Sequence, residues 1–178
     1  MELCIGQKVA YPNQGVCVVE EIERKDLGNG RLSVYLLRVL SDNSTIIVPI
    51  DNAEAVGIRP IISSIQCKKL IRKLSTDFEP ISSDWKSRSR EFQEKLRSGD
   101  VFEAVDVLKK LTFLSYEKRL SFREQTLLEK AKFLIISEVT NADSSEEDAL
   151  SEEIDRLVTS ACRKHLAVQP SVMTAASH

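Results

Sequence analysis

The spacing of apolar residues changes its period near residue 60, and this change constrains the fold more than any other feature. Before it, short runs rich in Val and Ile are separated by turn signals such as Pro12-Asn13-Gln14-Gly15 and the pair Asn29-Gly30, a strong hairpin signal. From residue 61 onward the apolar positions recur every three or four residues, as in amphipathic helices. The sequence therefore predicts an α+β chain, in which a small, strongly bent β-sheet or barrel precedes an all-α domain of about five helices.

Capping signals locate several of the expected helices. Asp84 can cap a helix that runs from Trp85 to Leu96, and Ser121 with Glu124 has the spacing of a capping box for a long helix. The last helix is expected from Leu150 to Cys162. We expect the β domain to cover residues 1–58 and the helical domain to cover residues 61–165. Residues 166–178 are expected to form a flexible tail.

Charge is unevenly distributed, although the net charge is only -2. Residues 61–137 carry 16 Lys or Arg and 11 Asp or Glu, a balance of +5, whereas residues 138–178 carry 3 and 8, a balance of -5. A basic middle segment is a candidate surface for a polyanion. The alternative is a solvated helical face of mixed charge, and charge counting alone favours this alternative.

Several classes of function have no support in the residues. The four cysteines form no C-x-x-C pair, and both histidines lie near the end of the chain, so neither a zinc site nor another metal or cofactor is expected. Nucleotide-binding and hydrolase motifs are missing, and no carboxylate pair lies beside a candidate nucleophile, so we do not expect an enzyme. No apolar run approaches the roughly 18 residues of a membrane span, and the first residues do not resemble a secretory signal, so a cytoplasmic protein is expected.

Two blocks of sequence resemble the CarD (CarD/CdnL) family of bacterial transcription regulators. The first is Gly6-Gln7-Lys8-Val9-Ala10-Tyr11-Pro12-Asn13-Gln14-Gly15-Val16 together with Ile46-Ile47-Val48-Pro49 and Val56-Gly57-Ile58-Arg59. The second combines Asp84-Trp85, Ser98-Gly99-Asp100-Val101 and Leu120-Ser121-Phe122-Arg123-Glu124. The resemblance implies a Tudor-like β domain that docks on the β subunit of RNA polymerase, and a helical domain that contacts promoter DNA at the upstream edge of the melted bubble.

The same resemblance implies that the protein stabilises the open promoter complex. It would act as a monomer, with no membrane partner, and reach the nucleoid through RNA polymerase. The DNA contact would involve the minor groove and the backbone without sequence-specific readout. The alternative is a protein-interaction adapter on RNA polymerase that does not bind DNA directly, a reading supported by the acidic last helix.

The resemblance places contacts to polymerase at four positions of the β domain, and some have a plain structural alternative. Leu37 and Ile47 could equally be core residues, because alternate residues of a strand face inward. Lys25 is the kind of residue that often lies in a solvated turn. The expected polymerase-binding residues are Lys25, Leu37, Ile47 and Pro49.

Trp85 is the sharpest expectation for the DNA contact. In the family, the tryptophan at the matching place acts as a wedge against the minor groove beside the bubble, as in architectural proteins. Without the resemblance, Trp85 would be read as a core residue, because it shares one helix face with Phe92 and Leu96. Ser87 and Ser89 lie where relatives often have a basic and an aromatic residue, so part of the family motif is missing here.

Basic residues complete the expected DNA surface. For each of them, a solvated surface position is at least as probable as a phosphate contact. A wider basic cluster near the Ser121 cap also includes Lys118, Arg119 and Arg123. The expected DNA-binding residues are Trp85, Lys86, Arg88, Arg90, Lys130 and Lys132.

Overall fold

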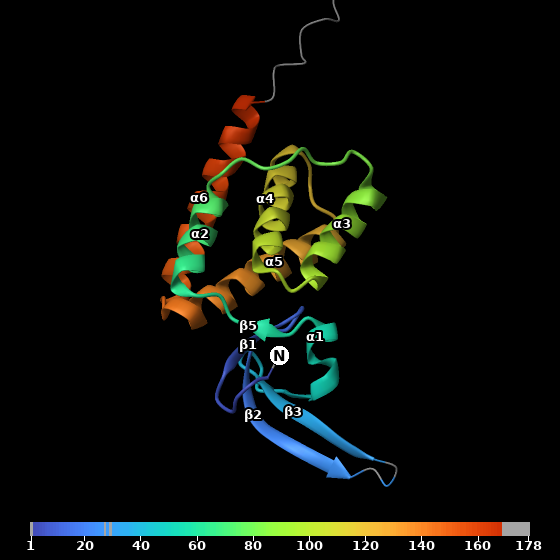
Figure 1. Cartoon of the computed structure of the whole chain (residues 1–178). Coiled ribbons are helices and arrows are strands. Elements are labelled where there is room, and N and C mark those ends of the chain that lie inside the picture. Colours follow the sequence, from blue (N-terminus) through green and yellow to red (C-terminus); the bar gives the residue numbers. More distant parts are fainter. Residues whose placement is uncertain (1, 27, 29, 169–178) are drawn as a thin grey trace, which may run out of the picture.

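A computed structural model describes residues 2–26, 28 and 30–168 of the chain. An antiparallel sheet at one end is followed by a group of helices at the other (Figure 1), so the expected α+β organisation is confirmed. The strands are β1 (Lys8–Tyr11), β2 (Gly15–Asp26), β3 (Arg31–Val39), β4 (Thr45–Pro49) and β5 (Arg59–Pro60). The helices are η1 (Ile50–Asn52), α1 (Ala53–Val56), α2 (Ser64–Leu74), α3 (Trp85–Arg97), α4 (Val101–Glu117), α5 (Phe122–Asp143) and α6 (Glu147–Val168).

The sheet has the strand order β4-β3-β2-β1-β5, with neighbouring strands antiparallel. The long β2–β3 hairpin extends away from the helices (Figure 1), and its pairing runs out to Asp26 opposite Arg31. The predicted turn at Asn29-Gly30 lies partly outside the described residues, because Asn29 is not among them. A register shift between Val19 and Glu21 bends β2, as bulges do. The small, strongly bent sheet agrees with the strand pattern of the sequence and with the Tudor-like domain that the resemblance implies.

Each half of the molecule has its own apolar core. In the sheet half, the buried side chain of Tyr35 lies among aliphatic residues, and its hydroxyl accepts a hydrogen bond from the Leu3 amide at 3.1 Å. In the helical half, α4 is the central element and packs against α2, α3, α5 and α6. Because α4 is surrounded, eleven of its 17 residues are buried, including polar ones.

Predicted helix ends agree with the structure where a capping signal exists. The side chain of Asp84 accepts hydrogen bonds at the start of α3, and Ser121 with Glu124 forms the predicted capping box of α5. The last helix differs from the prediction, because α6 begins at Glu147 and continues to Val168. Residues 166–168, expected in the tail, are therefore helical, and residues 169–178 lie outside the described part.

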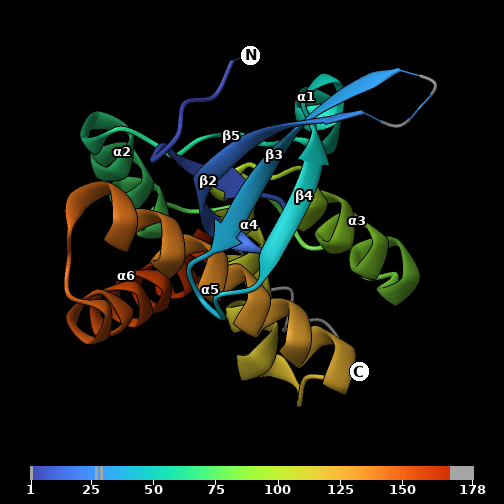
Figure 2. The ribbon, with the colours of Figure 1, turned by 90° about the horizontal axis from the view of Figure 1, so that it is seen from below.

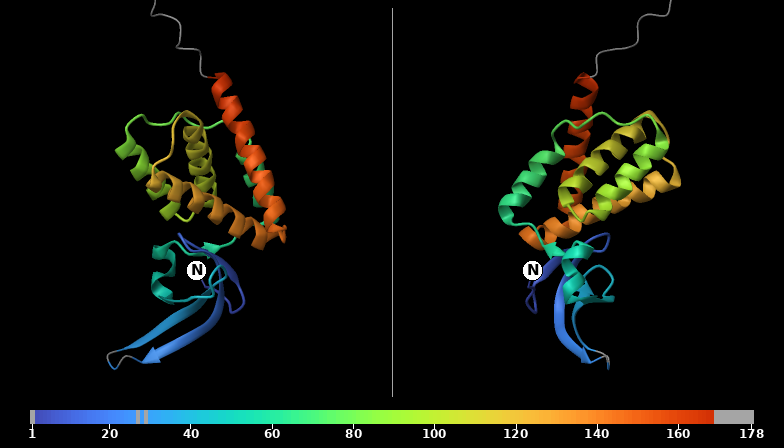
Figure 3. Two further views of the ribbon diagram at one scale, coloured as in Figure 1. Left: turned by 180° about the vertical axis from the view of Figure 1, so that it is seen from behind. Right: turned by 45° about the vertical axis from the view of Figure 1, so that its right-hand side comes forward.

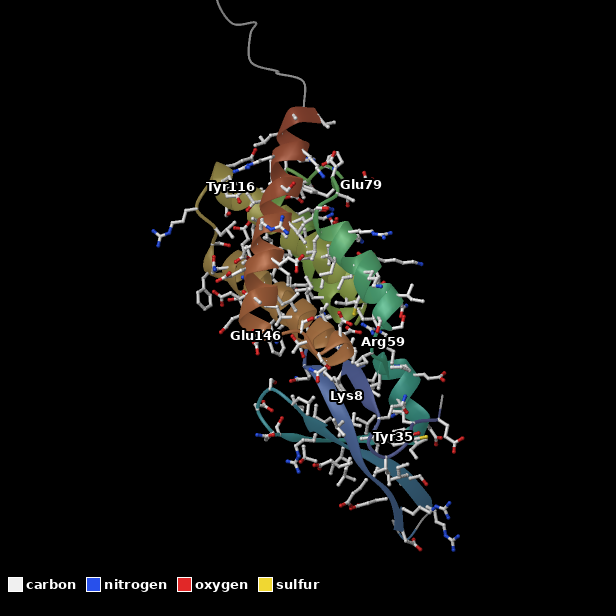
Figure 4. The ribbon with its side chains drawn as sticks, turned by 90° about the vertical axis from the view of Figure 1, so that its left-hand side faces the viewer. Lys8, Tyr35, Arg59, Glu79, Tyr116 and Glu146 are labelled. Carbon is white, nitrogen blue, oxygen red and sulfur yellow. The ribbon has the colours of Figure 1, made fainter. Side chains whose placement is uncertain are left out.

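The sheet and the helices meet along α5, which crosses the base of the helical half beside β2 (Figure 3). Arg59 lies at this junction (Figure 4), where its guanidinium binds the buried carboxylate of Glu138 on α5 and the Gly99 carbonyl. The Glu138 carboxylate also accepts a hydrogen bond from the Ile62 amide at 2.9 Å. A second link joins the Val16 amide to the Ser137 hydroxyl at 3.1 Å. These polar contacts hold the two halves in one orientation.

Candidate polymerase and DNA interface

Trp85 is the first residue of α3, and its side chain is 60% exposed. The helix begins there because the Asp84 carboxylate accepts hydrogen bonds from the amides of Lys86 and Ser87, which satisfies two of the unpaired donors of a helix N-terminus. The Lys86 ammonium lies 5.8 Å from the centre of the Trp85 ring. The reading of Trp85 as a core residue is therefore wrong, although Phe92 on the same helix is buried.

A buried ion pair holds the start of α3 against the start of α5. The Arg88 guanidinium donates to the Ser82 carbonyl at 2.8 Å and to the Glu124 carboxylate of α5 at 3.1 Å. Lys118 donates to the same carboxylate at 3.0 Å, and Ser121 completes the capping box. The network joins the first turn of α3 to the first turn of α5. We refer to Arg88, Lys118, Ser121 and Glu124 as the N-terminal brace.

The electrostatics of the brace follow from its hydrogen bonds. Burial by itself opposes ionisation of Glu124, but donors from the Ser121 backbone, Lys118, the Ser121 hydroxyl and Arg88 outweigh burial and lower the pKa of Glu124 to about 2. The carboxylate is therefore ionised at neutral pH and attracts both cations. Arg88, expected at the DNA surface, is instead buried in this brace, which corrects the prediction from sequence.

Of the other predicted DNA-binding residues, two lie exposed on α3 and two make contacts with other parts of the molecule. Lys86 and Arg90 lie at the surface of α3, and Arg90 forms an exposed ion pair with Glu94 at 2.9 Å. Lys130 is half-buried and donates to the Asn13 carbonyl of the β domain at 2.9 Å. Lys132 binds Asp155 of α6 at 2.7 Å. Lys130 and Lys132 thus make contacts within the molecule, and their role as DNA-binding residues stays a prediction.

The predicted polymerase-binding residues also differ in their exposure. Leu37 is fully buried in the core of the sheet, so its prediction as a contact residue is wrong and its alternative as a core residue is right. Ile47 lies in β4 and is 53% exposed, and the half-buried Pro49 ends the same strand. The backbone of Lys25 pairs with Leu32, while its side chain lies outside the described residues.

Strand β4 is the outermost strand at one end of the sheet. Figure 2 shows β4 and β3 on the side of the molecule that faces away from most of the helices. The opposite end of the sheet is β5, whose Arg59 binds the helical half. A strand at the edge of a sheet presents unpaired backbone donors and acceptors, which another chain can bind. Ile47 and Pro49 therefore lie on the sheet edge that is suited to docking.

Two features were missed from the sequence. Phe122 is the most exposed of the large hydrophobic residues described, at 90%, and it directly follows the Ser121 cap just as Trp85 follows the Asp84 cap. That shared position, an aromatic residue directly after a helix cap, is a signal that could have found it. The junction pair of Arg59 and Glu138 joins residues 79 apart, and no local pattern indicates it.

Other candidate chemistry is sparse in the described part of the chain. No group of three or more His, Cys, Asp or Glu there could hold a metal ion. All four cysteines are free, and burial raises the pKa of the Cys17 thiol to about 11. The described helices include none long and apolar enough to cross a membrane.

Comparison with known proteins gives two matching family models. The model described as CarD-like/TRCF RID domain matches residues 3–62, and the model described as CarD, C-terminal domain, matches residues 69–155. YdeB of Bacillus subtilis (strain 168), which is named as a candidate transcription factor, is 26% identical over 135 residues, covering 76% of this chain and 88% of YdeB.

A solved structure is also similar to part of this chain. The solution NMR structure of the 72-residue N-terminal domain of Myxococcus xanthus CarD is 36% identical, and the match covers 33% of this chain and 79% of that one, with a TM-score of 0.29. The two family models follow one another in the same order as the two halves of the structure and together span most of the sequence. The chain therefore belongs to the CarD family of transcription regulators.

Proposed function

We propose that this protein docks on the β subunit of RNA polymerase through strand β4 and contacts promoter DNA through the start of α3. It thereby stabilises the open complex at the upstream edge of the transcription bubble. The protein acts as a cytoplasmic monomer and reaches the nucleoid through polymerase. Membership of the CarD family supports the class of function, and the residues below support the two contacts.

The exposure of Trp85 is the observation that carries the DNA contact. An indole that is 60% exposed costs solvation free energy, and it lies at the first residue of a helix whose start is held by the N-terminal brace. A rigid aromatic side chain next to Lys86 can wedge against a partly unstacked base step while the cation meets the backbone. Such a contact recognises distorted DNA without reading bases.

The polymerase contact rests on the β4 edge. Strand addition supplies main-chain hydrogen bonds, and exposed side chains of the edge strand supply specificity. Ile47 lies in the middle of β4, with its side chain available to an apolar pocket of the partner. The short strand ends at Pro49, which limits uncontrolled pairing with other edges.

The test is the lifetime of the open complex formed by bacterial RNA polymerase with its primary sigma factor on a promoter whose open complex is short-lived, with and without the full chain. Trp85→Ala is expected to keep cooperative unfolding and polymerase binding but to lose most of the increase in lifetime. Ile47→Glu is expected to lose polymerase binding in a pull-down. Ile65→Ala, which removes a residue 70% exposed on α2, is the matched control and should leave both readouts unchanged.

An adapter that binds polymerase without DNA is the second candidate. It is favoured by the engagement of Arg88, Lys130 and Lys132 in contacts within the molecule. The same experiment separates the two functions. If Trp85→Ala matches the wild type in open-complex lifetime while Ile47→Glu is inactive, the adapter is correct and the DNA contact is refuted.

A further inference from the structure

Phe122 opens α5 with a side chain that is 90% exposed. Its neighbour Leu120 is half-buried and Glu124 is held in the brace, so the chain around Phe122 is fixed while the ring lies in solvent. A folded domain rarely exposes an aromatic ring to this extent, because burying it is favourable by up to about 3 kcal/mol. Phe122 is therefore a candidate for contact with a ligand.

The brace joins the two helices that begin with Trp85 and Phe122. Arg88 lies one turn into α3 and Glu124 lies in the first turn of α5, and their ion pair holds the two helix starts together. Both views of Figure 3 show the first turns of α5 beside α3. Two exposed aromatic residues thus begin two neighbouring helices whose first turns the brace joins.

A basic groove lies between these two helices on the Phe122 side. It has a volume of about 640 Å³, and none of the residues that line it is acidic. Arg97 of α3 and Arg123 of α5 are exposed there, and neither forms an ion pair with the described residues. Arg123 also lines the smaller groove that contains Trp85, so the two surfaces are continuous. The groove lining is Asn13, Gln93, Leu96, Arg97, Phe122, Arg123, Thr126, Leu127 and Lys130.

We propose that this groove binds a single-stranded segment of DNA, with Phe122 stacking on a base and Arg97 and Arg123 contacting phosphates. Proteins bind single strands through such a combination of stacking side chains and a positively charged groove. A duplex offers phosphates to the arginines but no free base face to Phe122, so the exposed ring favours an unpaired strand. The inference rests on the proposed function, in which Trp85 lies at the junction of duplex and unpaired DNA.

The test measures binding of the full chain by fluorescence anisotropy. The probes are a fork-junction DNA with a single-stranded arm and a blunt duplex of the same duplex sequence. Phe122→Ala is expected to weaken binding to the fork by about fivefold or more, which is the effect of losing one base stack, and to leave duplex binding unchanged. Arg123→Ser is expected to reduce the slope of log affinity against log salt by about 0.7 for the single-stranded arm.

Matched controls are Ile65→Ala, an exposed apolar residue on α2, and Arg163→Ser, an exposed arginine on α6. Circular dichroism verifies that every variant is folded. If Phe122→Ala binds the fork as Ile65→Ala does while Trp85→Ala loses fork affinity, this inference is overturned and the proposed function stands. If the wild type and Trp85→Ala bind the fork no better than the duplex, the DNA contact of the proposed function fails as well.

Discussion

Replacing Glu124 with glutamine tests whether the N-terminal brace is electrostatic. The carboxylate of Glu124 is nearly buried between Arg88 and Lys118, and the donors around it lower its pKa from 4.5 to about 2. Glutamine keeps the shape of the side chain but cannot ionise. The substitution therefore removes the charge from the brace while leaving room for several of its hydrogen bonds.

The size of the effect follows from the difference between the folded and unfolded pKa values. Because the folded pKa is lower, the unfolded state binds the proton more tightly, so the carboxylate stabilises the fold above pH 4.5 and loses that contribution as the pH falls toward 2. At about 1.4 kcal/mol per pH unit, the contribution is about 3 kcal/mol at pH 7 and about 1.4 kcal/mol at pH 3.

The assay is urea unfolding followed by circular dichroism at pH 7 and at pH 3, for the wild type and for Glu124→Gln. The difference in unfolding free energy between the two proteins should shrink by about 2 kcal/mol from pH 7 to pH 3. Glu94→Gln, which breaks an exposed pair with Arg90, is the control and should cost less than about 1 kcal/mol at pH 7. An equal difference at both pH values would refute the electrostatic account of the brace.

Two further predictions concern the junction between the sheet and the helices. Arg59→Met leaves the buried carboxylate of Glu138 without its cation, so we expect the free energy of unfolding, measured in urea, to fall by about 3 kcal/mol. A fall of less than about 1 kcal/mol would show that the pair does not hold the junction. Gly15 has a φ of +85°, and a Cβ there would lie 2.9 Å from the Ser137 hydroxyl. Gly15→Ala should therefore lower the free energy of unfolding by about 2 kcal/mol or more. Gly28→Ala, at a φ of +76° with nothing within 4 Å, is its control and should cost clearly less, and equal costs would contradict the contact argument.

Local sequence signals predicted the elements well. The change of hydrophobic period located the boundary between the sheet and the helices, because side-chain spacing along a strand or helix is set by that element alone. The Asp84 cap and the Ser121–Glu124 capping box located the starts of α3 and α5 for the same reason. The last helix is longer than predicted, because His165 continues the buried stripe of α6 beyond Cys162 and the residues from Leu166 extend a helix that is already formed.

The charge of individual helices was not enough to predict the binding surface. The basic balance of residues 61–137 includes cations that lie inside the helical half, among them Arg88, Lys109 and Lys110. The Lys109 ammonium donates to backbone carbonyls, among them that of Lys73, and burial lowers the pKa of Lys109 to about 8. Which cations are free depends on how one helix faces another, and that is a tertiary property. For this reason the sequence pointed to Arg88 and Lys130 as well as to Arg123, whereas in the structure Arg88 is buried, Lys130 is half-buried and Arg123 is exposed.

The rigid junction explains how two weak contacts can act together. If polymerase holds the β4 edge, the start of α3 is confined near one DNA position, and its second contact becomes intramolecular. The effective concentration of that second contact is high only when the link between the sites has the right length and little freedom. The Arg59–Glu138 pair and the link between Val16 and Ser137 remove that freedom at the point where the halves meet. Variants that loosen the junction should therefore shorten the open-complex lifetime, even though Arg59 and Glu138 lie outside both proposed contact surfaces.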